Sequence, residues 1–172
     1  VERLSETGEN AASVHFIRGE IAQARGDLTA AIVSYDEALE SDRNMAIAYA
    51  RRGRTKQRAD DVEGALADFD SALRLDSSLV DARAGRCWLS LRQERDLGRA
   101  RTDAETAVAA DAANVEAQLC RGILQLRGEE WTPARASFEA ALQLEPGNPT
   151  ALFGRGVARR RSGDNDGRED MN

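Results

Sequence analysis

The chain repeats one stretch of its own sequence. Residues 19–39 read GEIAQARGDLTAAIVSYDEAL, residues 53–73 read GRTKQRADDVEGALADFDSAL, and residues 122–142 read GILQLRGEEWTPARASFEAAL. The first two copies begin 34 residues apart. A constant period of this size is typical of stacked helix pairs, because each pair can bury its apolar face only against its neighbours. The repeat constrains the fold more than any other feature of this chain.

Each copy has the pattern of two helices joined by a short turn. In the first copy the predicted helices cover residues 13–25 and about 29–40, with Gly26-Asp27 as the turn. The apolar residues of the second half recur at three- and four-residue steps, which places them on one helical face. They are Leu28, Ala31, Ile32, Tyr35, Ala38 and Leu39. The sequence therefore predicts an all-α fold.

The period divides the chain into four full repeats and a partial fifth. The predicted boundaries are 12–45, 46–79, 80–114, 115–148 and 149–172, within a repeat domain spanning 12–172. Residues 1–11 are expected to be a linker or the remnant of a preceding element. The fifth repeat has one clear helix, to about residue 162, and no complete partner after it. Because terminal repeats of a solenoid normally need a polar cap, we expect the natural chain to continue past Asn172.

Two local signals refine these boundaries. The third repeat is one residue longer than the others, and we expect the extra residue in the turn near residues 92–96, since a turn tolerates an insertion better than a packed face. In the fourth repeat, Thr132-Pro133 is interpreted as N-cap and first helical residue. Residues 146–149, PGNP, are interpreted as a helix stop, a turn and a new cap.

Aligning the repeats reveals columns of similar residues that predict the core. Small residues at equivalent positions predict the close contacts between helices. They are Ala31, Ala65, Ala100 and Ala134, then Ala38, Ala72, Ala107 and Ala141. A larger hole is filled by Tyr35, Phe69 and Phe138, with Ala104 as the exception. A glycine column (Gly19, Gly53, Gly122 and Gly156, with Cys87 standing in) lies mid-helix, where glycine costs about 1 kcal/mol against alanine and so implies a packing reason.

These columns resemble the tetratricopeptide repeat (TPR) family. The small residue at Gly19, the turn at Gly26-Asp27, and then Ala31, Tyr35 and Ala38 follow that family's signature. The resemblance covers about residues 12–162. The early aromatic of the family is replaced by His15, Tyr49, Arg83, Gln118 and Leu152. The resemblance implies a right-handed α-α superhelix, with first helices lining a concave groove, and a non-catalytic role in holding other proteins.

A column of arginines directly precedes the small-residue column. Its members are Arg18, Arg52, Arg86, Arg121 and Arg155. We interpret it mainly as ion pairs to second-helix acids such as Asp68 and Asp103; a ladder for a ligand is the alternative.

The groove implied by the resemblance would have an apolar floor beside a row of arginines. The candidate partner-binding residues are Phe16, Glu20, Arg54, Arg58, Trp88, Arg92, Leu119, Ile123, Arg127, Phe153, Val157 and Arg161. Trp88, Arg54 and Arg92 are the expected hot spots, since Trp and Arg are over-represented in that role. A peptide with apolar anchors and acidic residues would match this surface. The arginines have an alternative reason to be there, because cations favour the last turn of a helix.

Composition and residue chemistry exclude several other functions. The formal net charge of −6 and a pI near 5.0 argue against a nucleic-acid partner, and no apolar run approaches the ~20 residues that span a bilayer. Cys87 and Cys120 indicate neither a metal site nor a disulfide scaffold. With one histidine and no phosphate loop, neither an enzyme nor a cofactor is expected. The compartment stays open.

The sequence thus predicts a protein–protein interaction scaffold that binds a peptide or a segment of a partner. One alternative is self-association through the incomplete terminal repeat. Another is a regulatory arm of a larger protein. The carboxylate clamp of some family members is not expected, because Glu20 and Phe16 stand where a clamp would place Asn and Lys.

Overall fold

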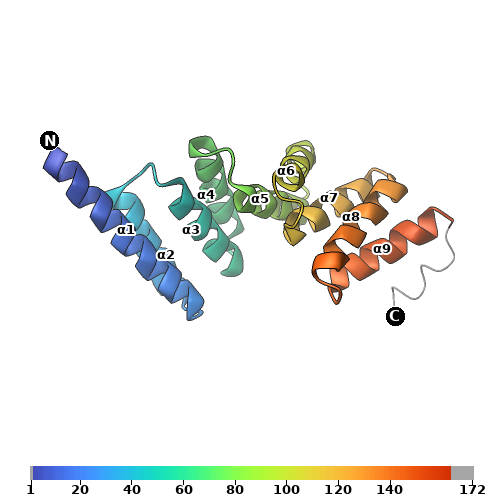
Figure 1. The fold of residues 1–172 in the computed structure, drawn as a ribbon, viewed down its shortest axis with the longest axis horizontal. Helices are drawn as coiled ribbons and strands as arrows, with labels where there is room; N and C mark the ends of the chain where they lie inside the picture. The colour runs from blue at the N-terminus through green and yellow to red at the C-terminus, as the bar shows by residue number, and fades with distance from the viewer. Residues whose placement is uncertain (1, 164–172) are drawn as a thin grey trace. The chain divides into compact units, whose positions relative to one another are not determined.

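A computed structural model describes residues 2–163 of the 172-residue chain. Within this range the chain forms nine α-helices and no strand (Figure 1). They are α1 (Glu2–Ala24), α2 (Leu28–Ser41), α3 (Ala46–Arg58), α4 (Val62–Leu75), α5 (Val80–Gln93), α6 (Leu97–Ala110), α7 (Val115–Arg127), α8 (Trp131–Leu144) and α9 (Pro149–Arg161). The predicted tail of the fifth repeat, residues 164–172, lies outside the described part.

The helices group into two compact units, residues 1–86 and 87–172, and the boundary between these ranges falls within the sequence of α5. In unit 1, α1 packs on α2, α2 on α3, and α3 on α4. In unit 2, α6 packs on α7, α7 on α8, and α9 on both α7 and α8. Inside each unit, helices that follow one another in sequence pack together, as the repeat predicts, and in unit 2 the first helices α7 and α9 are also in contact.

Helix ends follow the predicted turn chemistry in most repeats. Gly26 adopts a left-handed φ of +80°, and Asp27 caps α2 by accepting a hydrogen bond from the Ala30 backbone N–H at 3.0 Å. Asn148 caps α9 in the same way and Pro149 is the first helical residue, so the stop-and-cap interpretation of residues 146–149 is confirmed.

Two predicted helix starts are wrong. Helix α1 begins at Glu2 rather than at residue 13, since the segment before residue 13 is rich in residues that favour helix. Helix α8 begins at Trp131 with Glu130 as its N-cap residue, so Thr132-Pro133 is not the cap pair. Proline is tolerated within the first helical turn, where backbone N–H groups have no intrahelical acceptor, and it therefore did not mark the first residue.

The extra residue of the third repeat lies close to the predicted turn, but the structure adds it to the end of helix α5 and not to the turn itself. Helix α5 has 14 residues, whereas α3 and α7 have 13. The turn after α5 contains two left-handed residues, Glu94 (φ 52°) and Asp96 (φ 48°), whereas the equivalent turns of the other full repeats contain one. The insertion thus lengthens the helix by one residue, while the turn keeps three residues with a different backbone conformation.

The predicted core columns are buried. All eight column alanines are at most 1% exposed, as are Tyr35, Phe69 and Phe138. Glycine is required next to each of these rings: a Cβ at Gly53 would lie 3.0 Å from the Phe69 ring, one at Gly85 2.6 Å from the same ring, and one at Gly122 2.8 Å from the Phe138 ring. Each phenylalanine therefore inserts between a glycine of its own first helix and a glycine of the next first helix.

Candidate functional site

The arginine column forms structural ion pairs rather than a ligand ladder in the second repeat. Arg52 donates through Nε to Asp68 at 2.8 Å and through Nη1 to Asp36 at 2.6 Å, and Lys56 lies 2.9 Å from the same Asp68. The Asp68 side chain is only 5% exposed. Burial disfavours the charged form of Arg52, but these hydrogen bonds outweigh it and raise its pKa. The predicted pairing of this column with Asp68 is confirmed.

The column continues with different partners. Arg86 is buried and donates to Asp70 at 2.8 Å. Arg121 donates through Nε to the hydroxyl of Ser137 at 2.9 Å and through Nη2 to Gln118 at 2.8 Å. Burial lowers the pKa of Arg121, and Glu105 only partly opposes this. Each of these arginines holds a first helix to second helices, which leaves them little freedom to contact a partner.

In unit 1 the candidate residues lie in a polar network. Glu20 accepts a hydrogen bond from the Tyr35 hydroxyl at 2.5 Å and lies 3.5 Å from Nε of Arg51. Burial and the bond to Glu20 raise the pKa of Tyr35, which keeps its hydroxyl protonated as the donor. Phe16 is half-buried, with its ring 5.8 Å from that of Tyr35. Glu20 is thus committed to an internal bond.

The two candidate arginines of unit 1 both lie on α3. Arg54 is half-buried and donates to Gln57 at 3.3 Å, whereas Arg58 is exposed in the last turn. The candidate residues of unit 1 therefore present charge and little apolar surface.

In unit 2 the structure brings three apolar candidates together. Leu119 is buried at 7% exposure in a cluster that includes Phe138, and Trp88 and Ile123 pack against this cluster while remaining half-buried. Farther along, Phe153 on α9 is 61% exposed, the largest exposure among the big apolar side chains of the described part. Val157, one turn later on α9, is half-buried and lines a cleft of about 470 Å³ with Arg160 and Arg161.

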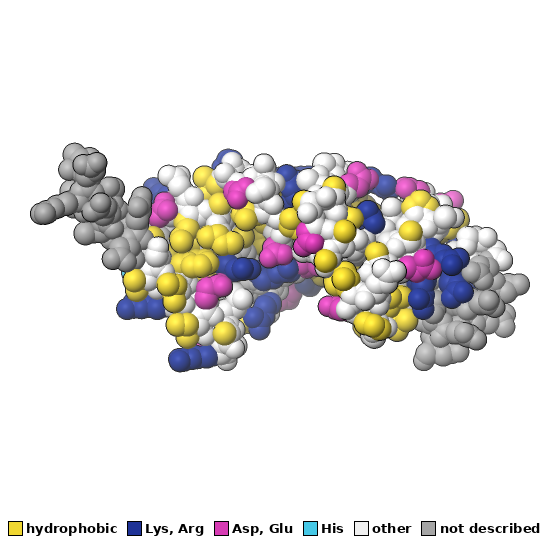
Figure 2. Space-filling model, in the orientation of Figure 1, with side chains coloured by type: hydrophobic (Ala, Val, Ile, Leu, Met, Phe, Trp, Pro, Cys, Tyr) yellow, Lys and Arg dark blue, Asp and Glu magenta, His cyan; other side chains and the backbone are white. Residues whose placement is uncertain are grey.

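Helices α5, α7 and α9 each carry an arginine in the last turn, four residues after Trp88, Ile123 and Val157 respectively. Arg92, Arg127 and Arg161 are all exposed. Arg127 pairs with Glu94 at 3.0 Å, and the Arg161 guanidinium lies 5.9 Å from the centre of the Trp131 ring. In the view of Figure 2, hydrophobic side chains form small groups among basic and acidic ones. Unit 2 thus combines half-buried apolar side chains with exposed positive charge.

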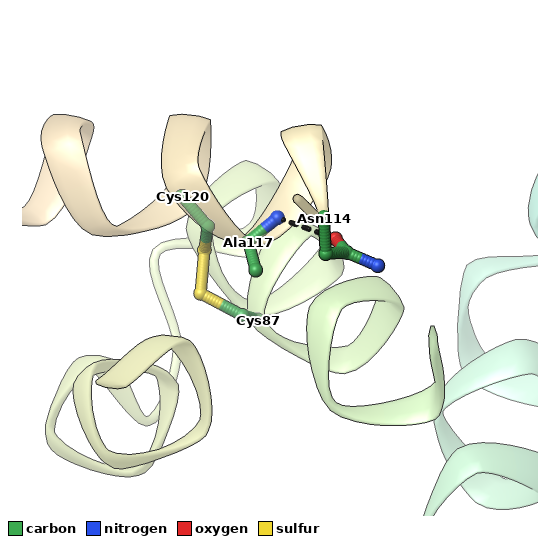
Figure 3. Close-up of a disulfide and its surroundings, with 4 residues drawn as sticks. All are labelled: Cys87, Asn114, Ala117 and Cys120. Carbon is green, nitrogen blue, oxygen red and sulfur yellow. Dashed lines mark hydrogen bonds between the residues drawn. A yellow bond between two sulfur atoms is a disulfide. The ribbon is translucent and has the colours of Figure 1, made fainter. Parts of the chain in front are cut away.

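Sequence reasoning missed a disulfide. Cys87 on α5 and Cys120 on α7 are bonded, with their Cα atoms 6.4 Å apart and both side chains fully buried (Figure 3). The expectation that these two cysteines indicate no disulfide is wrong. The signal was present but indirect: Cys120 occupies the repeat position of Gly85 and Gly154, which face the same ring positions as the glycine column.

An exposed apolar stripe on α1 was also missed. Val14, Ile17 and Ile21 are 43%, 56% and 47% exposed. They occupy the repeat positions of Ala117, Cys120 and Leu124 on α7, all of which are buried. The stripe is thus the face that packing covers in a later repeat, here open to solvent.

The described part of the chain lacks two other kinds of feature. Within residues 2–163 no helix is long and apolar enough to cross a membrane. In the same range no group of three His, Cys, Asp or Glu side chains is placed to hold a metal ion.

Comparison with known families and folds identifies the repeat. Tetratricopeptide repeat models match residues 12–45, 88–149 and 121–167. A comparison with curated protein sequences finds no match.

Solved structures with the same fold include several TPR proteins. PilF of Pseudomonas aeruginosa superposes with a TM-score of 0.80 at 18% identity, over 94% of this chain and 73% of that one. MamA gives 0.74 at 20% identity, over 94% and 86%, and YrrB gives 0.73 at 22%, over 91% and 80%. Together with the repeat models, these neighbours confirm the predicted all-α helical solenoid. The chain belongs to the tetratricopeptide repeat family, whose members act as scaffolds for protein–protein interaction.

Proposed function

We propose that this chain is a non-catalytic scaffold that binds an extended peptide segment of a partner protein on the first helices of unit 2. The observation that carries the proposal is that half-buried Trp88 and Ile123 pack on the buried cluster of Leu119 and Phe138, with an exposed arginine four residues after each of the two on α5 and α7. YrrB, a structural neighbour, is a TPR protein with an unusual peptide-binding site, which supports a peptide as the class of partner.

The chemistry of this surface selects the kind of peptide. Half-buried Trp88 and Ile123 and the exposed ring of Phe153 offer contacts to apolar anchors of a peptide. The aromatic side chains among them supply a large contact area and lose little conformational entropy on binding. Arg92, Arg127 and Arg161 attract acidic residues and speed association more than they tighten it. The proposed ligand is therefore an acidic segment with at least two apolar anchors.

The two units contribute unequally to this proposal. In unit 1, Phe16 and Glu20 are engaged with Tyr35, and Arg54 bonds to Gln57. We therefore expect Glu20, Arg54 and Arg58 to modulate binding through charge, Phe16 to contribute little, and Trp88 to be the main hot spot.

A peptide-library selection tests the proposal. The test variant combines Trp88→Ala, Phe153→Ala and Arg127→Glu. The matched control combines Leu144→Ala and Arg99→Glu, which alter an exposed leucine and an exposed arginine on the second helices α8 and α6. We expect the wild type and the control to enrich acidic peptides with apolar anchors, and the test variant to lose at least tenfold in affinity. Enrichment by no folded variant, or equal loss in the control, would contradict the proposal.

A second candidate function is self-association. The exposed stripe of Val14, Ile17 and Ile21 favours it, because equivalent faces are buried by packing within the array. Analytical sedimentation of the wild type and of Ile17→Ser tests this function. A mass that rises with protein concentration only in the wild type would support self-association. A constant monomer mass in both proteins would contradict it.

A further inference from the structure

The disulfide occupies the place of a missing aromatic ring. In the fourth repeat Phe138 inserts between Gly122 and Gly154, and each glycine leaves room for the ring. In the third repeat the ring position is Ala104, and the two glycine positions are Cys87 and Cys120. All three residues of this site thus differ between the two repeats. The volume lost by having alanine in place of phenylalanine is offset by the volume gained by having two cysteines in place of two glycines.

The surroundings of the disulfide are those of a core wedge. Cys87 and Cys120 share an apolar cluster with Ala104, and all three side chains are fully buried. The cluster joins α5, α6 and α7, the same three kinds of helix that Phe138 joins in the next repeat. The Cα separation of 6.4 Å lies within the range that a disulfide spans.

We propose that the Cys87–Cys120 disulfide substitutes for the aromatic wedge of the third repeat and makes the packing of α5, α6 and α7 depend on redox state. A dithiol reductant supplies two electrons and two protons, the sulfur–sulfur bond becomes two thiols, and the dithiol becomes a disulfide. After reduction the covalent link between α5 and α7 is lost, and Ala104 is too small to take the place of a ring between them.

The redox response should be local. Ile123 packs against this cluster and against the neighbouring Phe138 cluster, and Trp88 directly follows Cys87. Loosening at Cys87 therefore reaches these two residues first. The Phe138 wedge contains no sulfur and serves as an internal control.

A cycle of variants tests the substitution. Cys87→Gly/Cys120→Gly removes the disulfide and keeps Ala104. Adding Ala104→Phe to that pair rebuilds the glycine–phenylalanine–glycine arrangement of the fourth repeat. Ala104→Phe alone places a ring beside the intact disulfide. Thermal unfolding of each protein is measured with and without a dithiol reductant, after mass spectrometry has counted the free thiols.

The proposal predicts a reversal of sign. Reduction of the wild type should lower Tm by about 5–15 °C, as expected for loss of a typical native disulfide. Ala104→Phe should raise Tm in the glycine pair and lower it in the oxidised wild type, where the space is already filled. The Tm of the rebuilt triple variant should be the same with and without the reductant. A wild type with two free thiols under oxidising conditions, an unchanged Tm on reduction, or a phenylalanine that has the same effect in both backgrounds would overturn the proposal.

Discussion

Units 1 and 2 are built on the same repeat, but the contacts between the helices inside each unit differ in chemistry. In unit 1 the contacts between helices include a charged network, in which Arg52 and Lys56 converge on the buried Asp68. In unit 2 the third repeat keeps a buried acid at this position, Asp103, but the fourth repeat holds Arg121 on the neutral Ser137, and a disulfide and Phe138 join the helices. The repeat pattern therefore specifies which positions of neighbouring helices are in contact, while the kind of contact, whether an ion pair, a hydrogen bond, a disulfide or an aromatic ring, varies between repeats.

The comparison has a consequence for binding. In unit 1 the candidate residues Glu20 and Arg54 are bonded to Tyr35 and Gln57, whereas in unit 2 Trp88 and Ile123 pack on an apolar cluster and remain half-buried. Unit 2 is thus the better candidate to bind a peptide.

The largest effect is expected from removing the charge at the centre of unit 1. Asp68→Ala leaves Arg52 and Lys56 half-buried without their shared carboxylate, which should destabilise the protein by about 3–5 kcal/mol. Ser137→Ala, at the same register in unit 2, removes one hydrogen bond from the charged Arg121 and one to the neutral Gln125, and should cost less, about 1.5–3 kcal/mol. Denaturant unfolding measures both, and equal losses would remove the contrast between the units.

A smaller effect is expected from crowding an aromatic wedge. Gly122→Ala places a Cβ 2.8 Å from the Phe138 ring, and overpacking of this kind costs about 1–3 kcal/mol. Gly98→Ala is the control, because a Cβ there meets no heavy atom within 4 Å and helix propensity favours alanine. Thermal unfolding should therefore show opposite signs for the two variants. A neutral Gly122→Ala would mean that the ring position is not tightly packed.

The smallest effect concerns one surface carboxylate of unit 1. Ser78 donates its hydroxyl at 2.6 Å and its backbone N–H at 2.8 Å to Asp76, and both bonds lower the pKa of Asp76. A lowered pKa stabilises the folded state above the unfolded pKa, and this contribution is lost as the pH falls through the folded value. NMR titration should show the pKa of Asp76 rising in Ser78→Ala. An unchanged pKa would show that the hydroxyl is not the cause.

Much of the fold could be predicted from the sequence because the period is regular. Equivalent positions such as Ala31 and Ala65 are recognisable without any structure, and so is the insertion before Asp96. The disulfide escaped prediction because its two cysteines stand in different columns, 33 residues apart, and only the packing of one first helix on the next brings these columns together. The start of α1 escaped because its first residues carry no repeat pattern.

The candidate site was harder to predict than the fold. Repeat register marks Trp88 and Glu20 as equivalent, yet Glu20 is bonded to Tyr35 while Trp88 packs on an apolar cluster. Which residues of a column remain open to a partner depends on side chains from neighbouring helices, and the column alone does not contain that information.

Native-state hydrogen exchange with and without a dithiol reductant tests the contrast between the units most directly. We predict that reduction lowers the protection of backbone amides in α6, α7 and the C-terminal half of α5, while α1 to α4 keep theirs. Equal loss in both units, or no loss in α7, would contradict the account that a disulfide in unit 2 takes the place that the Phe69 ring has in unit 1.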